Sequence, residues 1–171
     1  MPGLFGSGPS HWQSVWEERY GYTRVVQEDW ERPDLDDWLL RLMAAVRSQA
    51  TPPILVAHSL GCALVAHLAR RAEPGSIAGA LLVAPADVDD PAHTPEETRC
   101  FAPMPLTRFA FPSVLVASRD DPFLRFDRGA EFAKHWGARL VDAGSIGHIN
   151  ADSALGEWTF GQRLLEGLRR D

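Results

Sequence analysis

A serine between small residues is the strongest chemical signal in the sequence. The segment reads Ala57-His58-Ser59-Leu60-Gly61, where an apolar run ends and an amphipathic segment begins. A sharp strand-to-helix turn of this kind lifts a serine hydroxyl clear of a sheet, and only very small side chains fit two positions before and after it. The turn also aims the N–H of Leu60 at the site, where it could stabilise an oxyanion. The alternative interpretation is that Ser59 merely caps the helix that follows.

A serine hydroxyl needs an imidazole to accept its proton and a carboxylate to orient that imidazole. Two aspartates, Asp120 and Asp121, follow the apolar run 113–118, and His148 follows the run 138–142. We predict Asp121 as the acid, because the proline after it fixes the local backbone; Asp120 remains the alternative. The order serine, acid, histidine is the one expected after such a turn. Taken singly, these residues would be ordinary turn aspartates and a surface histidine.

The elements that must position these residues follow from the hydrophobic pattern. Apolar runs of strand length alternate with amphipathic segments of helix length, which predicts a parallel sheet with helices on both faces. The expected helices cover residues 11–20, 34–48, 60–71, 127–136 and 156–170. The expected strands cover residues 22–27, 54–57, 77–84, 113–118 and 138–142. We expect Ser10 to cap the first helix, residues 87–110 to form an irregular excursion, and the chemistry to lie at the carboxyl ends of the strands.

The composition predicts a single α/β domain over residues 1–171. A net charge of −6 argues against nucleic acid as a partner, which requires a basic face, and against an anionic membrane. The two cysteines, Cys62 and Cys100, are too few for a disulfide framework. Because the N-terminus does not resemble a signal peptide, we expect a cytoplasmic protein. No cluster has zinc-type spacing and no phosphate-binding loop is present, so we expect neither metal nor cofactor. Nothing in the sequence specifies an oligomeric state.

Together these segments resemble a family of small serine hydrolases that includes the YdeN-type bacterial proteins and retinoblastoma-binding protein nine. The resemblance covers nearly the whole chain and rests on Pro2-Gly3, residues 6–13, His58-Ser59-Leu60-Gly61, Asp120-Asp121-Pro122-Phe123 and Gly147-His148-Ile149. It implies a minimal three-layer α/β-hydrolase with little or no cap, and a triad of Ser59, Asp121 and His148. It also implies that Leu4 supplies a second oxyanion N–H.

The N-terminus departs from that pattern. In such proteins an apolar strand precedes the Pro-Gly block in the interior of the sheet, whereas here only Met1 precedes Pro2. If that first strand is missing, the strand expected at 22–27 loses its neighbour and backbone groups are left unpaired. We therefore expect that extending the chain upstream raises the melting temperature.

The residues and the resemblance together predict hydrolysis of a small ester, thioester or amide through an acyl-enzyme on Ser59. The expected partner is a small-molecule acyl substrate. His11, Trp12 and Phe123 could line an apolar pocket, although aromatic side chains equally suit the core. The alternative is a protein-binding module on a hydrolase scaffold with little turnover, because a fold does not determine a function.

Overall fold

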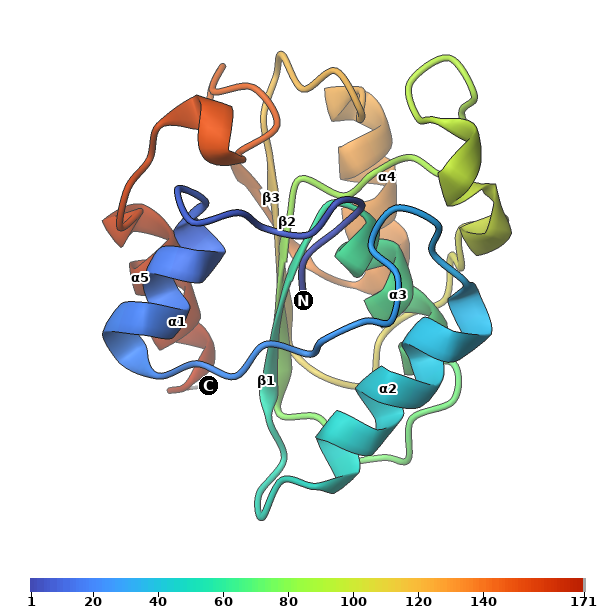
Figure 1. The fold of residues 1–171 in the computed structure, drawn as a ribbon, viewed down its shortest axis with the longest axis vertical. Helices are drawn as coiled ribbons and strands as arrows, with labels where there is room; N and C mark the ends of the chain where they lie inside the picture. Colours follow the sequence, from blue (N-terminus) through green and yellow to red (C-terminus); the bar gives the residue numbers. More distant parts are fainter. Residues whose placement is uncertain (171) are drawn as a thin grey trace.

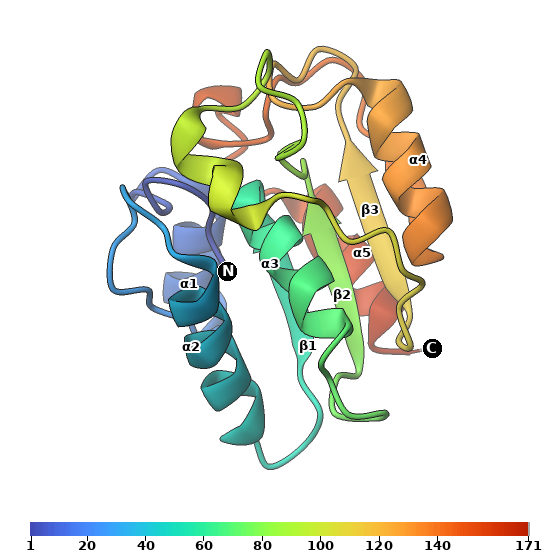
Figure 2. The same cartoon turned by 90° about the vertical axis from the view of Figure 1, so that its right-hand side faces the viewer.

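A parallel sheet of four strands forms the centre of the structure, a computed structural model that describes residues 1–170. In spatial order the strands are β1 (Ile54–His58), β2 (Gly79–Val83), β3 (Ser113–Ala117) and β4 (Arg139–Asp142). Every residue of β2 and β3 is buried, as expected for strands covered on both faces. Because all neighbouring pairs are parallel, the four carboxyl ends meet at one edge, where the connecting loops gather (Figure 2).

Helices cover both faces of this sheet (Figure 1). One face carries α2 (Leu35–Arg47), α3 (Leu60–Ala69) and α4 (Phe126–Trp136), and the other carries α1 (Trp12–Tyr20) and α5 (Thr159–Leu168). Each face has its own hydrophobic cluster. Two short 3₁₀ helices lie in the loops, η1 (Glu96–Phe101) and η2 (Ala151–Ser153). The predicted three-layer α/β class is confirmed.

The first two helices begin where side chains cap them. Asp34 accepts a hydrogen bond from the N–H of Asp37 at the start of α2, a role that aspartate commonly takes at a helix N-terminus. At the start of α1 the cap is His11, whose Nδ1 accepts from the N–H of Gln13 at 3.1 Å. The prediction that Ser10 caps α1 is therefore wrong by one residue, because an imidazole nitrogen takes the acceptor role instead.

The prediction of a strand at residues 22–27 is also wrong. This segment has no regular secondary structure and crosses the molecule beside β1, between α1 and α2 (Figure 1). The sheet ends at β1, and no strand lies next to this segment closely enough to form a ladder with its backbone. Its β-branched and aromatic residues favour a strand, but a strand needs a partner as well as a propensity.

Met1 makes the only ladder-type contacts on the outer edge of β1 within residues 1–170. Its amine donates to the carbonyl of Val56 at 2.6 Å, and its carbonyl accepts from the N–H of His58 at 3.0 Å. These two bonds have the pattern of a parallel bridge. Because alternate residues of a strand face the same edge, the backbone groups of Ile54 point outward as well, and no described group pairs with them.

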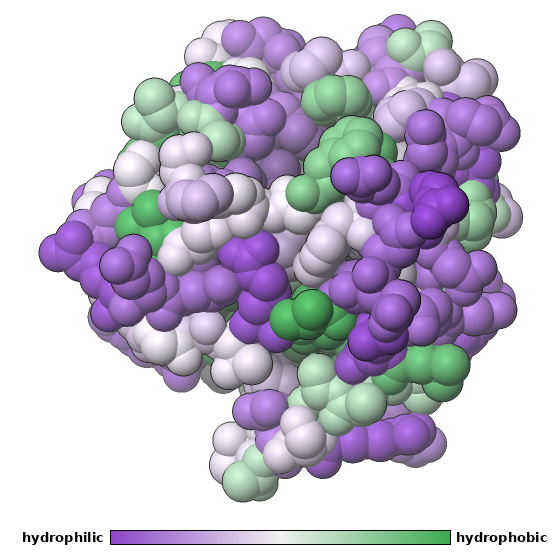
Figure 3. Space-filling view, viewed as in Figure 1, coloured by the Kyte–Doolittle hydropathy of each residue, from purple (hydrophilic) through white to green (hydrophobic). Residues whose placement is uncertain are grey.

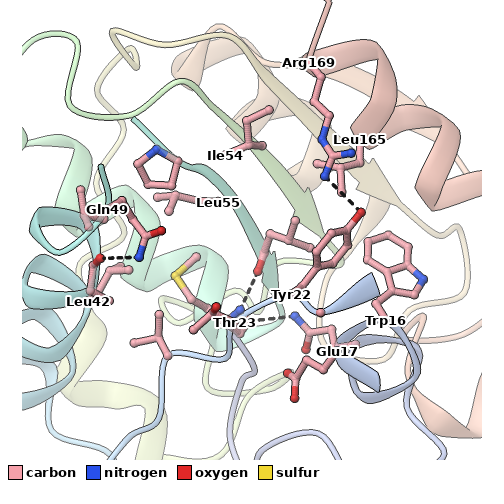
Figure 4. Close-up of a pocket in the computed structure, with 18 residues that line it drawn as sticks. Trp16, Glu17, Tyr22, Thr23, Leu42, Gln49, Ile54, Leu55, Leu165 and Arg169 are labelled. Atoms are coloured by element: carbon pink, nitrogen blue, oxygen red, sulfur yellow. Dashed lines mark hydrogen bonds between the residues drawn. The ribbon is translucent and has the colours of Figure 1, made fainter. Parts of the chain in front are cut away.

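A groove of about 370 Å³ runs along this open edge between β1 and the segment after α1 (Figure 4). The face that carries it shows hydrophobic surface near its middle, flanked by hydrophilic surface (Figure 3). Apolar and aromatic side chains make up much of the lining, including Trp16, Tyr22, Leu42, Val46, Ile54 and Leu165. The edge therefore combines unpaired backbone groups with apolar side chains, the surroundings that a further strand would complete.

We predict that about six β-branched apolar residues, joined ahead of Met1, pair with β1 and stabilise the fold. The melting temperature should rise by roughly 5 °C, since each added hydrogen bond contributes ~1 kcal/mol net and ~1 kcal/mol shifts it by about 2–4 °C. The measurement is thermal unfolding followed by circular dichroism. An extension with prolines at the positions facing β1 is the control, because proline cannot donate to the ladder. Equal melting of all three chains would refute the prediction.

Two buried imidazoles, His11 and His58, pack against each other with ring centroids 4.7 Å apart. Burial, aided by Arg24, lowers the pKa of His11 from its usual 6.5 to about 4. Burial, followed by the neighbouring His148 and His11, lowers the pKa of His58 well below 6.5. Below pH 6.5 the unfolded chain therefore binds more protons at these positions than the folded chain does, so stability falls as the pH drops.

We predict that His11→Asn flattens this acid sensitivity. Asparagine keeps an acceptor for the N–H of Gln13 at the helix cap but cannot be protonated. The variant should lose less of its free energy of unfolding between pH 7 and pH 4.5 than the wild type, measured by urea denaturation at several pH values. If both proteins lose the same amount, His11 is not a source of the sensitivity.

Candidate active site

Ser59 lies on the turn that joins β1 to α3. Its backbone has φ 54° and ψ −124°, a conformation that is strained for any residue other than glycine. Its N–H extends the sheet by donating to the carbonyl of Val83 at 3.0 Å. The Ser59 hydroxyl makes no capping hydrogen bond with α3, and the residue is partly exposed. The interpretation of Ser59 as a helix cap is therefore contradicted, because the turn presents the hydroxyl instead of using it.

The N-terminal segment packs so closely against this turn that only glycine fits at two positions. A Cβ on Gly3 would lie 2.7 Å from the Cβ of Ser59 and 2.9 Å from the nitrogen of Leu60. A Cβ on Gly61 would lie 2.6 Å from the carbonyl oxygen of Met1. Gly61 therefore makes room for the N-terminal segment, whereas the sequence pattern suggested close contact between strand and helix.

Leu60 and Leu4 carry the two backbone N–H groups expected to form an oxyanion hole. Leu60 is the first residue of α3, where N–H groups have no acceptor within the helix. Leu4 follows Gly3, which touches Ser59. Within residues 1–170 neither N–H donates to another backbone group. Both are thus available to an anion that forms beside the serine.

Asp121 and His148 form a buried hydrogen-bonded pair. The Nδ1 of His148 lies 2.9 Å and 3.0 Å from the two carboxylate oxygens of Asp121. An ionised carboxylate only accepts, so Nδ1 carries the proton and Nε2 keeps a free lone pair. The carboxylate is itself held by the N–H of Phe123, which donates to it at 2.9 Å. The phenyl ring of Phe123 packs edge-on against the imidazole, 4.6 Å between centroids.

Asp120 contacts different groups from its neighbour Asp121. Its Oδ1 accepts from the hydroxyl of Ser118 and from the N–H of Gly147, both at 2.8 Å. These two bonds, the first more than the second, lower the pKa of the Asp120 carboxyl. Asp120 therefore holds the loop before His148, while Asp121 contacts the imidazole. Of the two aspartates that the sequence offered, the structure brings Asp121 to the histidine.

His58 links the serine turn to the histidine loop. Its Nε2–H donates to the backbone carbonyl of His148 at 2.9 Å, and the two imidazole centroids are 4.8 Å apart. Since His58 precedes Ser59 directly, this contact ties the His148 loop to the serine turn, although within residues 1–170 no hydrogen bond joins the Ser59 hydroxyl to the His148 imidazole. Sequence reasoning missed this link, because a contact across 90 residues leaves no local pattern.

The irregular excursion at residues 87–110 also contacts the loop that carries Asp121. It contains η1 but is otherwise irregular, as predicted. The N–H of Asp87 donates to the carbonyl of Phe123 at 3.0 Å, and Nδ1 of His93 donates to the carbonyl of Pro122 at 3.2 Å. The loop that carries Asp121 is thus held by hydrogen bonds to two of its backbone carbonyls.

Two of the three predicted pocket residues are not accessible. His11 is 4% exposed and Trp12 is 1% exposed, because both pack into the aromatic cluster between α1 and the sheet. Phe123 is half-buried and does lie beside His148. Phe5, which the sequence analysis did not single out, is 70% exposed and follows Leu4 directly. Phe5 and Phe123 are therefore the partly exposed aromatic side chains next to the predicted site residues Leu4 and His148.

No group of three or more His, Cys, Asp or Glu side chains in residues 1–170 is placed to hold a metal ion. In that same part of the chain, every helix is too short or too polar to cross a membrane. Cys62 and Cys100 are both free thiols.

Comparisons with known proteins agree with this geometry. A family model described as serine hydrolase matches residues 1–167. A putative YdeN-like hydrolase from Pectobacterium atrosepticum is 35% identical, with a TM-score of 0.85 over 98% of this chain and 88% of that one. The ydeN gene product of Bacillus subtilis is 20% identical, with a TM-score of 0.76 over 99% and 96%. A monoacylglycerol lipase from Paleococcus ferrophilus is 12% identical, with a TM-score of 0.68 over 98% and 91%.

A search of curated protein sequences found no match. The two lower identities support the fold alone. The family model spans nearly the whole sequence, however, and the alignment with the 35% identical relative covers 98% of this chain. The chain therefore belongs to the serine hydrolase family and has the α/β-hydrolase fold.

Proposed function

We propose that this protein hydrolyses small carboxylic esters through an acyl-enzyme on Ser59, with His148 as general base and Asp121 as its orienting acid. The observation that carries the proposal is the buried Asp121–His148 pair, set beside a serine whose strained turn leaves its hydroxyl uncapped. Membership of the serine hydrolase family supports hydrolysis as the reaction class. The ester as substrate is our proposal.

Acylation begins when Oγ of Ser59 attacks the carbonyl carbon of the ester. The Ser59 proton moves to Nε2 of His148, which is free because Nδ1 holds its proton against Asp121. The carbonyl oxygen becomes an oxyanion, which the N–H groups of Leu60 and Leu4 stabilise. When the intermediate collapses, the imidazolium returns the proton to the departing alkoxide, and the alcohol leaves.

Deacylation repeats these steps with water. His148 removes a proton from water as the oxygen attacks the acyl carbon, and the same two N–H groups hold the second oxyanion. The bond to Oγ then breaks, the proton returns to Ser59, and the carboxylic acid is released. No cofactor takes part in either half of this reaction.

The side chains around Ser59 favour a small apolar substrate. Phe5 is largely exposed beside Leu4, and Phe123 is half-exposed beside His148. These rings offer apolar surface to an acyl or alkyl group. A panel of p-nitrophenyl esters of increasing acyl length, with a thioester and an anilide alongside, would define the preference.

We predict that a fluorophosphonate probe labels Ser59 and that Ser59→Ala abolishes the labelling. The reason is that the probe reacts only with a serine whose hydroxyl is activated by a base. The readout is mass spectrometry of the labelled peptide. Ser10→Ala is the matched control, because Ser10 is exposed and lies outside the site. Labelling that persists in Ser59→Ala would refute Ser59 as the nucleophile, and a folded wild type that stays unlabelled would favour a binding module with little turnover.

We predict that Asp121→Asn lowers kcat for p-nitrophenyl acetate by ~10⁴-fold, because an amide no longer secures the required tautomer of His148. Asp120→Asn should cost far less, since its carbonyl oxygen can still accept from Gly147 and Ser118. Steady-state kinetics of both variants decides the assignment. A larger loss in the Asp120 variant would transfer the orienting role to Asp120.

A further inference from the structure

The loop that carries His148 holds a second strained segment. Gly147 has φ 66° and Ile149 has φ 50°. The left-handed region suits glycine, but a β-branched residue adopts it only when its surroundings impose it. Ile149 is fully buried, so its side chain is fixed on one side of the segment. Something must hold the backbone as well, because relaxation at residue 149 would turn the neighbouring imidazole.

Two ring N–H groups hold two consecutive carbonyls of this segment. Nε2–H of His58 donates to the carbonyl of His148 at 2.9 Å, and Nε1–H of Trp12 donates to the carbonyl of Ile149 at 2.7 Å. Both bonds are buried, so water does not compete for either acceptor. One donor comes from β1 and the other from α1, and together they fix the orientation of two successive peptide groups.

Both donor rings are themselves held in place. The indole of Trp12 packs against those of Trp16 and Trp158, with centroids 4.6 Å and 4.8 Å away. The imidazole of His58 lies between those of His11 and His148, 4.7 Å and 4.8 Å away. Since a carbonyl only accepts, the neutral form of His58 must carry its proton on Nε2. The donors are therefore rigid and in the correct state to bond.

We propose that His58 and Trp12 are positioning residues, which hold the strained His148–Ile149 backbone so that the imidazole of His148 stays aligned between Asp121 and Ser59. This inference rests on the proposed function, because it assigns these residues a role in the same reaction. Neither residue touches substrate. Each acts through a hydrogen bond to the main chain of the segment that carries the base.

The chain provides a matched control for each donor. Trp16 belongs to the same aromatic cluster, and its Nε1–H donates to the carbonyl of Glu157 at 2.6 Å. His67 is buried, and its Nε2–H donates to the carbonyl of Phe101 at 2.7 Å. The variants Trp12→Phe and Trp16→Phe each lose one indole donor. The variants His58→Phe and His67→Phe each lose one imidazole donor.

We predict that Trp12→Phe and His58→Phe each lower kcat for p-nitrophenyl acetate by ~10-fold or more, because small displacements of a catalytic group carry large rate penalties. The KM should change by less than about twofold, since substrate contacts are retained. The controls Trp16→Phe and His67→Phe should keep kcat near the wild-type value even where their melting temperatures fall equally. His58→Gln, which restores a donor near the position of Nε2, should recover most of the lost kcat.

A second readout does not depend on turnover. In spectra of ¹⁵N-histidine-labelled protein, His148 should show a single Nδ1–H tautomer in the wild type and both controls, and mixed tautomers in Trp12→Phe and His58→Phe. If the wild type has no Ser59-dependent activity, the proposed function fails while the spectra still test the positioning. If the folded Trp12 and His58 variants match their controls in tautomer, or in kcat where turnover is present, the inference is overturned.

Discussion

The backbone conformation at Ser59 is the constraint on which the site depends. A non-glycine residue at φ 54° persists only where neighbouring groups leave it no alternative. Here the turn is held by the strand before it and the helix after it, and Gly3 packs directly against the Ser59 side chain. The uncapped hydroxyl and the free N–H of Leu60 both follow from that one turn. The rest of the candidate site is arranged around a hydroxyl whose position is already determined.

The parallel sheet brings the other two groups to the same place. Asp121 follows β3 and His148 follows β4, and these strands pair in register from Val114–Arg139 to Ala117–Asp142. Their carboxyl ends therefore lie next to each other, and short loops carry the carboxylate and the imidazole into contact. A second strained segment, at Ile149, completes the arrangement. The strands bring the two side chains close together, and hydrogen bonds to the loop backbone fix their orientation.

Most of the sheet and its helices could be predicted from the sequence, because buried parallel strands are continuous apolar runs and the helices α2, α4 and α5 are strongly amphipathic. The strand at 22–27 could not, since its formation depends on a neighbour that local propensity does not reveal. The preference for Asp121 over Asp120 agrees with the structure, whereas the role of Asp120 in holding Gly147 was not evident, because both residues follow the same strand and differ only in which loop atoms they meet. The contacts of Trp12 and His58 span more than 85 residues, so only the folded chain displays them.

Residues 1–4 contact both the edge of the sheet and the turn that carries Ser59. Met1 bridges to the outer edge of β1, Gly3 packs against Ser59, and the next residue is Leu4, whose N–H we propose as an oxyanion donor. The contact at the edge of the sheet and the proposed oxyanion donor therefore belong to the same short segment. Any substitution that slides the first residues along β1 also changes the distance between an amide and the reacting oxygen. We therefore expect substitutions at the margin of the sheet to change the proposed reaction rate even where Ser59, His148 and Asp121 are unaltered.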